Sequence, residues 1–147
     1  METEPVIITA IMLSDSVIRE HGSNKISLLG CFAMWNAPIF PFQSPPFVIT
    51  PFISNLRGTS GELTITVKIE NSNRHCVWST MAKVNFQAAN QTVPADAIID
   101  IPFRAAGVQF PTPDRYTVRV LVNADEIGHR DITVRPITVP NLPTQPT

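Results

Sequence analysis

Three histidines are the side chains in this sequence best suited to hold a metal ion or to transfer a proton: His21, His75 and His129. A metal site needs several histidine, cysteine or carboxylate ligands that converge on one point. The three histidines are far apart and show no paired spacing. His75 is next to Cys76, but neighbouring residues of a strand point to opposite faces. The sequence therefore predicts no metal site, and we expect no cofactor.

A nucleophilic site could be formed by Ser14, Ser16 and His21, which lie close together, with Asp15 between the two serines. Such a site needs a nucleophile that a base activates, and hydrolases often present it on a strained turn. Nothing in this stretch resembles that turn, and the chain has no glycine-rich phosphate loop. Asp15 is interpreted instead as a cap that accepts backbone hydrogen bonds in a turn. We therefore expect that the protein is not an enzyme.

The charge of the chain is low and evenly spread. Charged residues make up 16% of the sequence and the net charge is −1, whereas about 25% charged residues is usual for soluble proteins. Nucleic-acid binding needs clustered lysine and arginine, so no nucleic-acid partner is expected. Residues 1–5 are acidic where a secretory signal would be basic, and the apolar run at 6–13 is too short for a membrane span. The expected location is the cytoplasm.

The two cysteines, Cys31 and Cys76, lie in unrelated predicted strands. One interpretation is a pair of reduced, buried thiols in a cytosolic protein. The other is a disulfide between two packed sheets. The sequence leaves both open.

Hydrophobic residues recur with the period of a strand through most of the chain. In residues 63–70 and 116–122 every second residue is apolar, which predicts strands with one buried face. Predicted strands cover 6–13, 26–33, 47–56, 63–70, 76–86, 97–103, 115–122 and 127–134. About eight short strands without a convincing helix indicate an all-β protein, specifically an antiparallel β-sandwich. We assign residues 1–135 to one domain and residues 136–147 to a proline-spaced tail or arm.

Two proline-rich segments could serve as contact surfaces. Residues 36–46 contain four prolines, which exclude a central strand or a helix. The segment either crosses between sheets with its aromatic side chains capping the core, or exposes an apolar patch to a partner. The tail is either a frayed end or an arm that docks on a neighbouring subunit. The candidate interaction residues are Trp35, Ile39, Phe40, Phe42, Ile137, Val139 and Leu142.

Two short motifs resemble those of a widespread family of small bacterial proteins of unknown function. Residues 10–17 followed by 25–32 are similar to the opening of that family. In that opening a strand ends in an acidic residue, a turn follows, and the return strand begins with lysine and continues through hydrophobic residues and a serine or threonine to glycine. Residues 116–122 followed by Ile127-Gly128 resemble its closing pattern, although the usual Asn-Gly or Asp-Gly turn is replaced by Ala124-Asp125-Glu126. The resemblance implies an immunoglobulin-like sandwich and a bacterial, intracellular setting. It implies no catalytic residues.

These observations favour a non-enzymatic structural or interaction protein. It would assemble with itself, as a homo-oligomer or filament, or with another protein, through open sheet edges and the C-terminal arm. The alternative is a module that binds a small molecule or carbohydrate with loop residues such as Arg57, Asn73 and Asn90.

Overall fold

The protein is built from strands throughout its described part. The computed structural model describes residues 6–54, 62–85 and 98–137, which contain twelve strands and no helix. The strands are β1 (Ile7–Arg19), β2 (Ile26–Cys31), β3 (Met34–Ala37), β4 (Phe42–Gln43), β5 (Phe47–Ser54), β6 (Glu62–Glu70), β7 (Cys76–Asn85), β8 (Ile99–Asp100), β9 (Phe103–Ala105), β10 (Gln109–Phe110), β11 (Asp114–Val122) and β12 (Asp125–Pro136). The predicted all-β fold is confirmed. The strands beyond the expected eight are short ones: β3, β4, β9 and β10.

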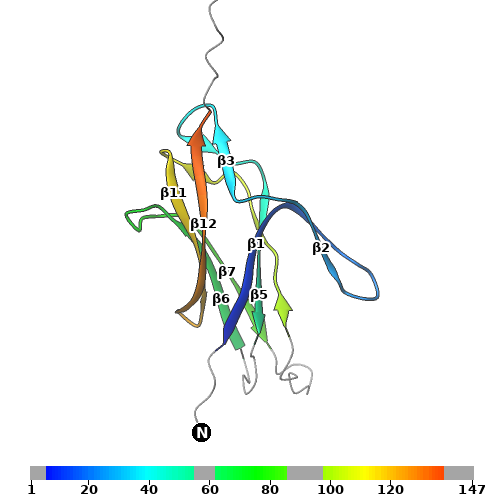
Figure 1. Ribbon diagram of the computed structural model, residues 1–147. Coiled ribbons are helices and arrows are strands. Elements are labelled where there is room, and N and C mark those ends of the chain that lie inside the picture. The colour runs from blue at the N-terminus through cyan, green and yellow to red at the C-terminus, as the bar shows by residue number, and fades with distance from the viewer. Residues whose placement is uncertain (1–5, 55–61, 86–97, 138–147) are drawn as a thin grey trace, which may run out of the picture.

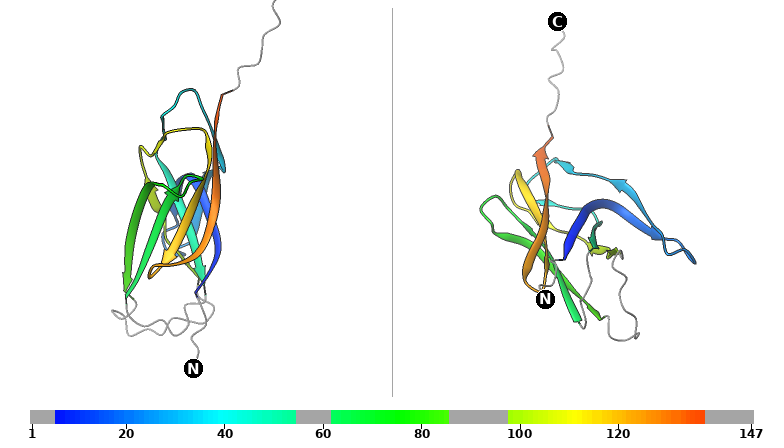
Figure 2. Two further views of the ribbon diagram at one scale, coloured as in Figure 1. Left: turned by 90° about the vertical axis from the view of Figure 1, so that its left-hand side faces the viewer. Right: turned by 60° about the horizontal axis from the view of Figure 1, so that its bottom comes forward.

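Two five-stranded sheets carry most of the structure. In the first sheet the order is β2-β1-β5-β8, and β9 also pairs with β5; in the second it is β3-β12-β11-β6-β7. Neighbouring strands are antiparallel except β12 and β3, which are parallel. Figures 1 and 2 show the sheets facing each other in the body of the domain, while the hairpin of β1 and β2 projects to one side. No described helix is long and apolar enough to cross a membrane.

Side chains from both sheets meet in one core. The alternating residues of β6 and β11 are buried as the period of two predicts. From the second sheet the core contains Leu63, Ile65, Val67, Ile69, Tyr116, Val118, Val120, Val122, Ile132 and Val134. From the first sheet it contains Ile11, Leu13, Phe47, Ile49 and Ile53. Tyr116 is fully buried, and its hydroxyl donates a 2.6 Å hydrogen bond to the Thr112 carbonyl, so burial leaves no unpaired polar group there.

The first strand is longer than the sequence suggested. The sequence pattern predicts a first strand over residues 6–13, but residues 14–19 continue β1. Ile18 is 55% exposed as a result. A turn follows, in which Gly22 and Asn24 have positive φ, and β2 then pairs with residues 14–19. This pairing makes a hairpin that extends beyond the body of the domain (Figure 1).

The turn between β11 and β12 places Asn123 and Ala124 in the left-handed region, at φ 50° and 73°. Val122 pairs with Asp125, so the loop has two residues, the arrangement that usually takes Asn-Gly. Alanine in this conformation costs about 1 kcal/mol because its Cβ approaches the carbonyl oxygen.

Replacing Ala124 with glycine is therefore expected to raise the free energy of unfolding by about 1 kcal/mol. Thermal unfolding followed by circular dichroism would show this as a melting temperature higher by about 3 °C. Asn123→Gly is the matched control. It should bring no gain, because asparagine tolerates the left-handed region and the Asn123 side chain accepts a 3.0 Å bond from the Thr64 N–H. An unchanged melting temperature for Ala124→Gly would show that the turn holds no such strain.

Thr50 in β5 is fully buried, and its hydroxyl has no hydrogen-bond partner in the part of the chain that the structure describes. A buried hydroxyl without a partner is unfavourable by about 1–3 kcal/mol. Thr50→Val, which keeps the shape, should raise the free energy of unfolding by about 1 kcal/mol. Thr50→Ser keeps the hydroxyl and loses the methyl group, so it should lower that free energy. Urea titrations of both variants test the prediction, and a less stable valine variant would contradict it.

Candidate interaction surfaces

The projecting hairpin, residues 14–31, is the most exposed part of the first sheet. Asp15 and Gly30 stand opposite each other in it, because Ser14 pairs with Cys31 and Ser16 with Leu29. Gly30 has φ 68°, and a Cβ at this position would overlap the Asp15 carboxyl group. The expected turn cap at Asp15 is therefore wrong: Asp15 lies within a strand, beside a glycine that makes room for it.

The outer edge of this hairpin is open. Within the described ranges, β2 pairs only with β1. The Glu20 N–H donates to the Lys25 carbonyl. Since bonded residues alternate along an antiparallel pair, Ser27 and Leu29 bond to β1. Ile26 and Leu28 then present their N–H and C=O groups to the open edge.

Apolar side chains accompany this open edge. Ile18 and Leu29 lie on one face of the hairpin, because they pair with Ser27 and Ser16 respectively. They are 55% and 46% exposed. β2 contains no proline and no charged residue, the features that usually protect an edge strand from pairing with another chain.

An ion pair ties the hairpin to the body of the domain. The Arg19 guanidinium contacts the Asp100 carboxylate, which belongs to β8 at the far side of the first sheet, and also donates a 3.0 Å bond to the Asn24 carbonyl. The pair is partly exposed, so its contribution to stability is at most about 1 kcal/mol. The contact joins the end of β1 to β8, two strands that do not pair with each other in the first sheet.

Trp35 and Phe42, two of the candidate interaction residues, are half-buried in an aromatic cluster at one end of the core. The ring centroid of Trp35 lies 4.9 Å from Phe47, 5.4 Å from Phe110 and 5.9 Å from Phe42. The ring centroid of Phe32 lies 4.6 Å from Trp35 and 5.9 Å from Phe47. These contacts close one end of the core, and they leave Phe32, Trp35 and Phe42 partly accessible to solvent.

The other candidate residues lie beside this cluster or beyond the described residues. Phe40 is half-buried, whereas Ile39 is 72% and Ile137 is 50% exposed. The Ile137 N–H donates a 3.0 Å bond to the Ala37 carbonyl, so the chain leaves β12 alongside β3. Val139 and Leu142 lie outside the described residues.

A shallow groove of about 390 Å³ runs between β1 and β12. It is lined by Ile8, Thr9, Ala10, Ile11, Met12, His129 and Arg130. Arg130 Nη1 donates a 2.7 Å bond to the Ile11 carbonyl, which satisfies a backbone group that no neighbouring described strand pairs. Gly128 lies so close to Ile8 that a Cβ would overlap its Cγ2 atom. These two contacts close the gap between the edges of the two sheets.

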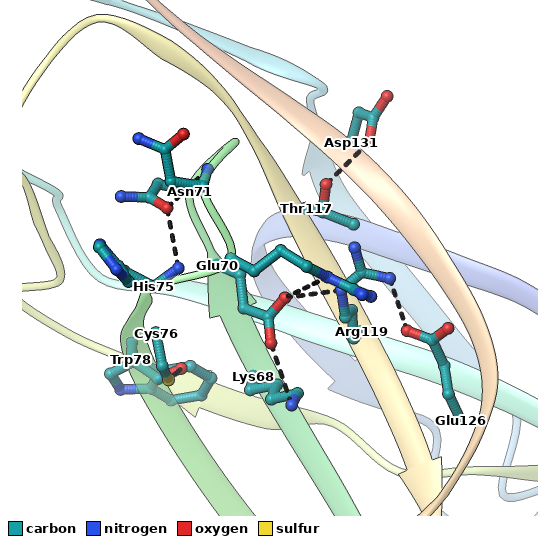
Figure 3. Close-up of polar contacts among 12 residues, drawn as sticks. Lys68, Glu70, Asn71, His75, Cys76, Trp78, Thr117, Arg119, Glu126 and Asp131 are labelled. Carbon is teal, nitrogen blue, oxygen red and sulfur yellow. Dashed lines mark hydrogen bonds and ion pairs between the residues drawn. The ribbon is translucent and has the colours of Figure 1, made fainter.

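Charged side chains are concentrated on the outer face of the second sheet, where Figure 3 shows Glu70 at their centre. The Glu70 carboxylate accepts a 2.8 Å bond from Arg119 Nε and lies 3.0 Å from Lys68 Nζ. Arg119 also donates a 2.7 Å bond to Glu126. Glu70 is buried, whereas Lys68 and Glu126 reach solvent.

This network shifts the pKa values of Glu70 and Arg119. Burial raises the pKa of Glu70, but the hydrogen bonds and charges of Lys68 and Arg119 together outweigh it, and the net pKa lies below the ordinary value. The hydrogen bonds from Arg119 to Glu126 and Glu70 raise the pKa of Arg119. The Glu70 carboxylate and the Arg119 guanidinium therefore both stay ionised at neutral pH.

The residues considered for chemistry do not converge. His21 lies in the hairpin turn, His75 in the turn between β6 and β7, and His129 in the groove. In the described parts of the chain no three metal-ligating side chains come together. The Ser14 hydroxyl donates to the Ser16 carbonyl rather than to His21.

The thiols of Cys31 and Cys76 are both free and exposed, so neither the buried interpretation nor the disulfide holds. The pairing of β6 with β7 has a bulge between Ile69 and Glu70. Because of this bulge Cys76 points away from the core, whereas Trp78 packs against it. Of the residues proposed for ligand binding, Asn73 is exposed in a turn, and Arg57 and Asn90 lie outside the described residues.

Comparison with known proteins gives a family and solved structures of similar fold. Residues 9–135 match a family of unknown function, DUF6941, which confirms the resemblance to an uncharacterised family. No curated protein matches. The structure is similar to that of Pseudomonas fluorescens alkylpurine DNA glycosylase AlkC bound to DNA containing an abasic site analog, with a TM-score of 0.50 and 16% identity. The match covers 88% of this chain and 30% of the glycosylase chain.

This comparison corrects two expectations. The protein was expected to be no enzyme and to have no nucleic-acid partner, on the basis of missing motifs and low charge. A similar fold is part of a DNA glycosylase that is bound to DNA, so neither exclusion stands. A domain without catalytic motifs or clustered charge can still be part of a larger enzyme, because function depends on particular sites that other parts of a protein can supply. At this identity the likeness shows the fold alone.

Proposed function

This chain belongs to DUF6941, a family of unknown function, and from that premise we propose that it is an interaction protein that assembles with copies of itself. The observation that carries the proposal is the projecting hairpin, whose outer edge is open and unprotected. A two-stranded hairpin is marginal in water on its own, and a further strand would stabilise it. The low charge of the chain also favours association.

Two other features support parts of this proposal. The bond from the Tyr116 hydroxyl to the Thr112 carbonyl at the start of β11 is like the tyrosine corner of immunoglobulin-like sandwiches. We adopt that architecture as part of the proposal. The free thiols of Cys31 and Cys76 support a reducing, cytoplasmic setting.

The proposal is tested by light scattering on a sizing column over a range of protein concentrations. The expected result is a mass that corresponds to two or more chains and rises with concentration. A monomer mass of 16.2 kDa at every concentration would refute self-assembly. Negative-stain images of the same fractions distinguish a closed oligomer from a filament.

A second candidate function is contact with DNA, which the structure of the DNA-bound glycosylase favours. The test is fluorescence anisotropy with a labelled duplex that contains an abasic-site analog, at low and at physiological salt. Binding that weakens steeply with salt would support a role at the phosphate backbone. Anisotropy that stays flat at low salt and micromolar protein would remove this candidate.

A further inference from the structure

We propose that the open edge of β2 accepts residues 138–142 of a second copy of the chain as an added strand. This inference rests on the proposed self-assembly and assigns its two contact surfaces. Pairing of an extended segment with a sheet edge takes affinity from backbone hydrogen bonds and specificity from alternate side chains.

The acceptor is defined by the geometry of the hairpin. Ile26 and Leu28 direct their N–H and C=O groups away from β1, as the alternation that begins at Glu20 and Lys25 requires. Ile18 and Leu29 expose apolar surface on one face of the same hairpin. An added strand would cover part of that surface and would turn a two-stranded ribbon into a three-stranded sheet.

The donor is defined by the position of its prolines. Ile137 directs its N–H toward β3, where it bonds to Ala37. In an extended chain Val139 and Asn141 would direct theirs to the same side. Pro136 and Pro140 alternate with these residues, so in an extended chain their backbone nitrogens, which carry no hydrogen, would lie on the side away from the acceptor. Pro143 follows as the next residue that cannot donate a backbone hydrogen bond. The five residues 138–142 are then available to pair along β2, which has six residues.

The donor belongs to a second copy because of where the two surfaces lie. Figure 1 shows β12 ending at the top of the domain, while the hairpin projects from its side. Residues 138–142 reach at most about 18 Å when extended. Pairing with the hairpin of the same copy would require this short segment to turn back sharply from the direction in which β12 ends.

Other open surfaces fit this donor less well. The groove between β1 and β12 is partly closed, because Arg130 already bonds to the Ile11 carbonyl. The outer edge of β7 carries Lys83, a residue that discourages strand addition.

Donor and acceptor are different surfaces of one chain, so each copy can both give and receive a strand. Such a contact closes into a ring or continues as a filament. It also predicts that two variants, each defective in one surface, complement each other.

The experiment uses matched proline substitutions in the full chain, with mass measured by light scattering. Val139→Pro removes an N–H that faces the acceptor, and Thr138→Pro removes one that faces away. We expect the first to give monomers and the second to assemble like the natural chain. On the acceptor, Leu28→Pro should give monomers, whereas Leu28→Ala, which keeps the backbone N–H, should still assemble.

Mixing provides the decisive measurement. Leu28→Pro retains the donor, and a chain without residues 138–147 retains the acceptor. Each alone should be a monomer, and the mixture should double in mass and grow no further. This result also shows that Leu28→Pro is folded. Assembly that survives both Val139→Pro and Leu28→Pro, or a mixture that stays monomeric, would overturn the inference and leave the proposed self-assembly intact. A natural chain that is monomeric throughout would overturn both.

Discussion

Replacing Gly128 with alanine is expected to lower the free energy of unfolding by about 2–3 kcal/mol. The added Cβ would overlap Ile8 Cγ2, a branched methyl group that cannot rotate away without disturbing its own packing. β12 would then have to move away from β1 at the place where the edges of the two sheets meet. Urea unfolding at neutral pH measures the loss.

A double-mutant cycle separates this contact from a general effect of Gly128. Ile8→Ala removes the obstructing methyl group and by itself lowers stability modestly, because Ile8 packs against the core. Gly128→Ala in the Ile8→Ala background should then cost less than about 1 kcal/mol, a coupling that identifies the two residues as direct neighbours. Additive losses would show that Gly128 is required for another reason.

Glu70→Ala is expected to produce the other large loss, about 2–3 kcal/mol. Glu70 is buried and separates two cations, Lys68 and Arg119, which lie directly opposite each other on β6 and β11. Without the carboxylate, two like charges face each other across the strands. The loss is smaller than for a fully buried pair because both cations reach solvent. Glu126→Ala, at the exposed side of the same network, should cost less than about 1 kcal/mol.

The same carboxylate makes stability depend on pH. The pKa of Glu70 is lowered below its ordinary value of 4.5 by its hydrogen bonds to Lys68 and Arg119, which outweigh the opposing effect of burial. A group with a depressed pKa stabilises the folded state above its unfolded pKa, and this contribution is lost as pH falls through the folded value. Between pH 7 and pH 3 the natural chain should therefore lose more stability than Glu70→Ala. Asp114, whose pKa Ser72 also lowers, acts in the same direction in both proteins. Equal losses would show that Glu70 is not linked to folding.

The regular strands could be predicted from the sequence because they obey a single rule. In β6, Leu63, Ile65, Val67 and Ile69 are buried, and the residues between them reach the outer face. This pattern depends only on the pleat of the strand and on one buried side. The same rule predicted β11 correctly, including the outward position of Arg119.

The rule failed where tertiary contacts replaced local pattern. The polar residues Asp15 and Ser16 indicated the end of a strand. In the structure β1 continues to Arg19, because residues 14–19 pair with β2 and Arg19 forms an ion pair with Asp100. Arg130 occupies a position that faces inward and is accommodated only because the Ile11 carbonyl is within its reach. Asp100 is distant in sequence from Arg19, and Ile11 is distant from Arg130, so no local pattern could have indicated these two contacts.

The contact surfaces were predictable to different extents. The aromatic side chains around Trp35 and the tail were noticed because of their composition. The open edge of β2 was missed because an edge is a property of the assembled sheet, and β2 reads as an apolar strand that could equally have been central.

The parallel ladder between β3 and β12 also bears on when the proposed strand exchange would become possible during folding. It joins the first quarter of the chain to its last, through the pairing of Met34 with Thr133. Contacts this distant in sequence form late, because the entropy of a very long loop must be lost before they do. The projecting hairpin is local and forms early. The donor segment, in contrast, gains its direction only when β12 docks on β3. A nascent or partly folded chain would therefore offer an acceptor but no oriented donor, and strand exchange would be delayed until the domain is complete.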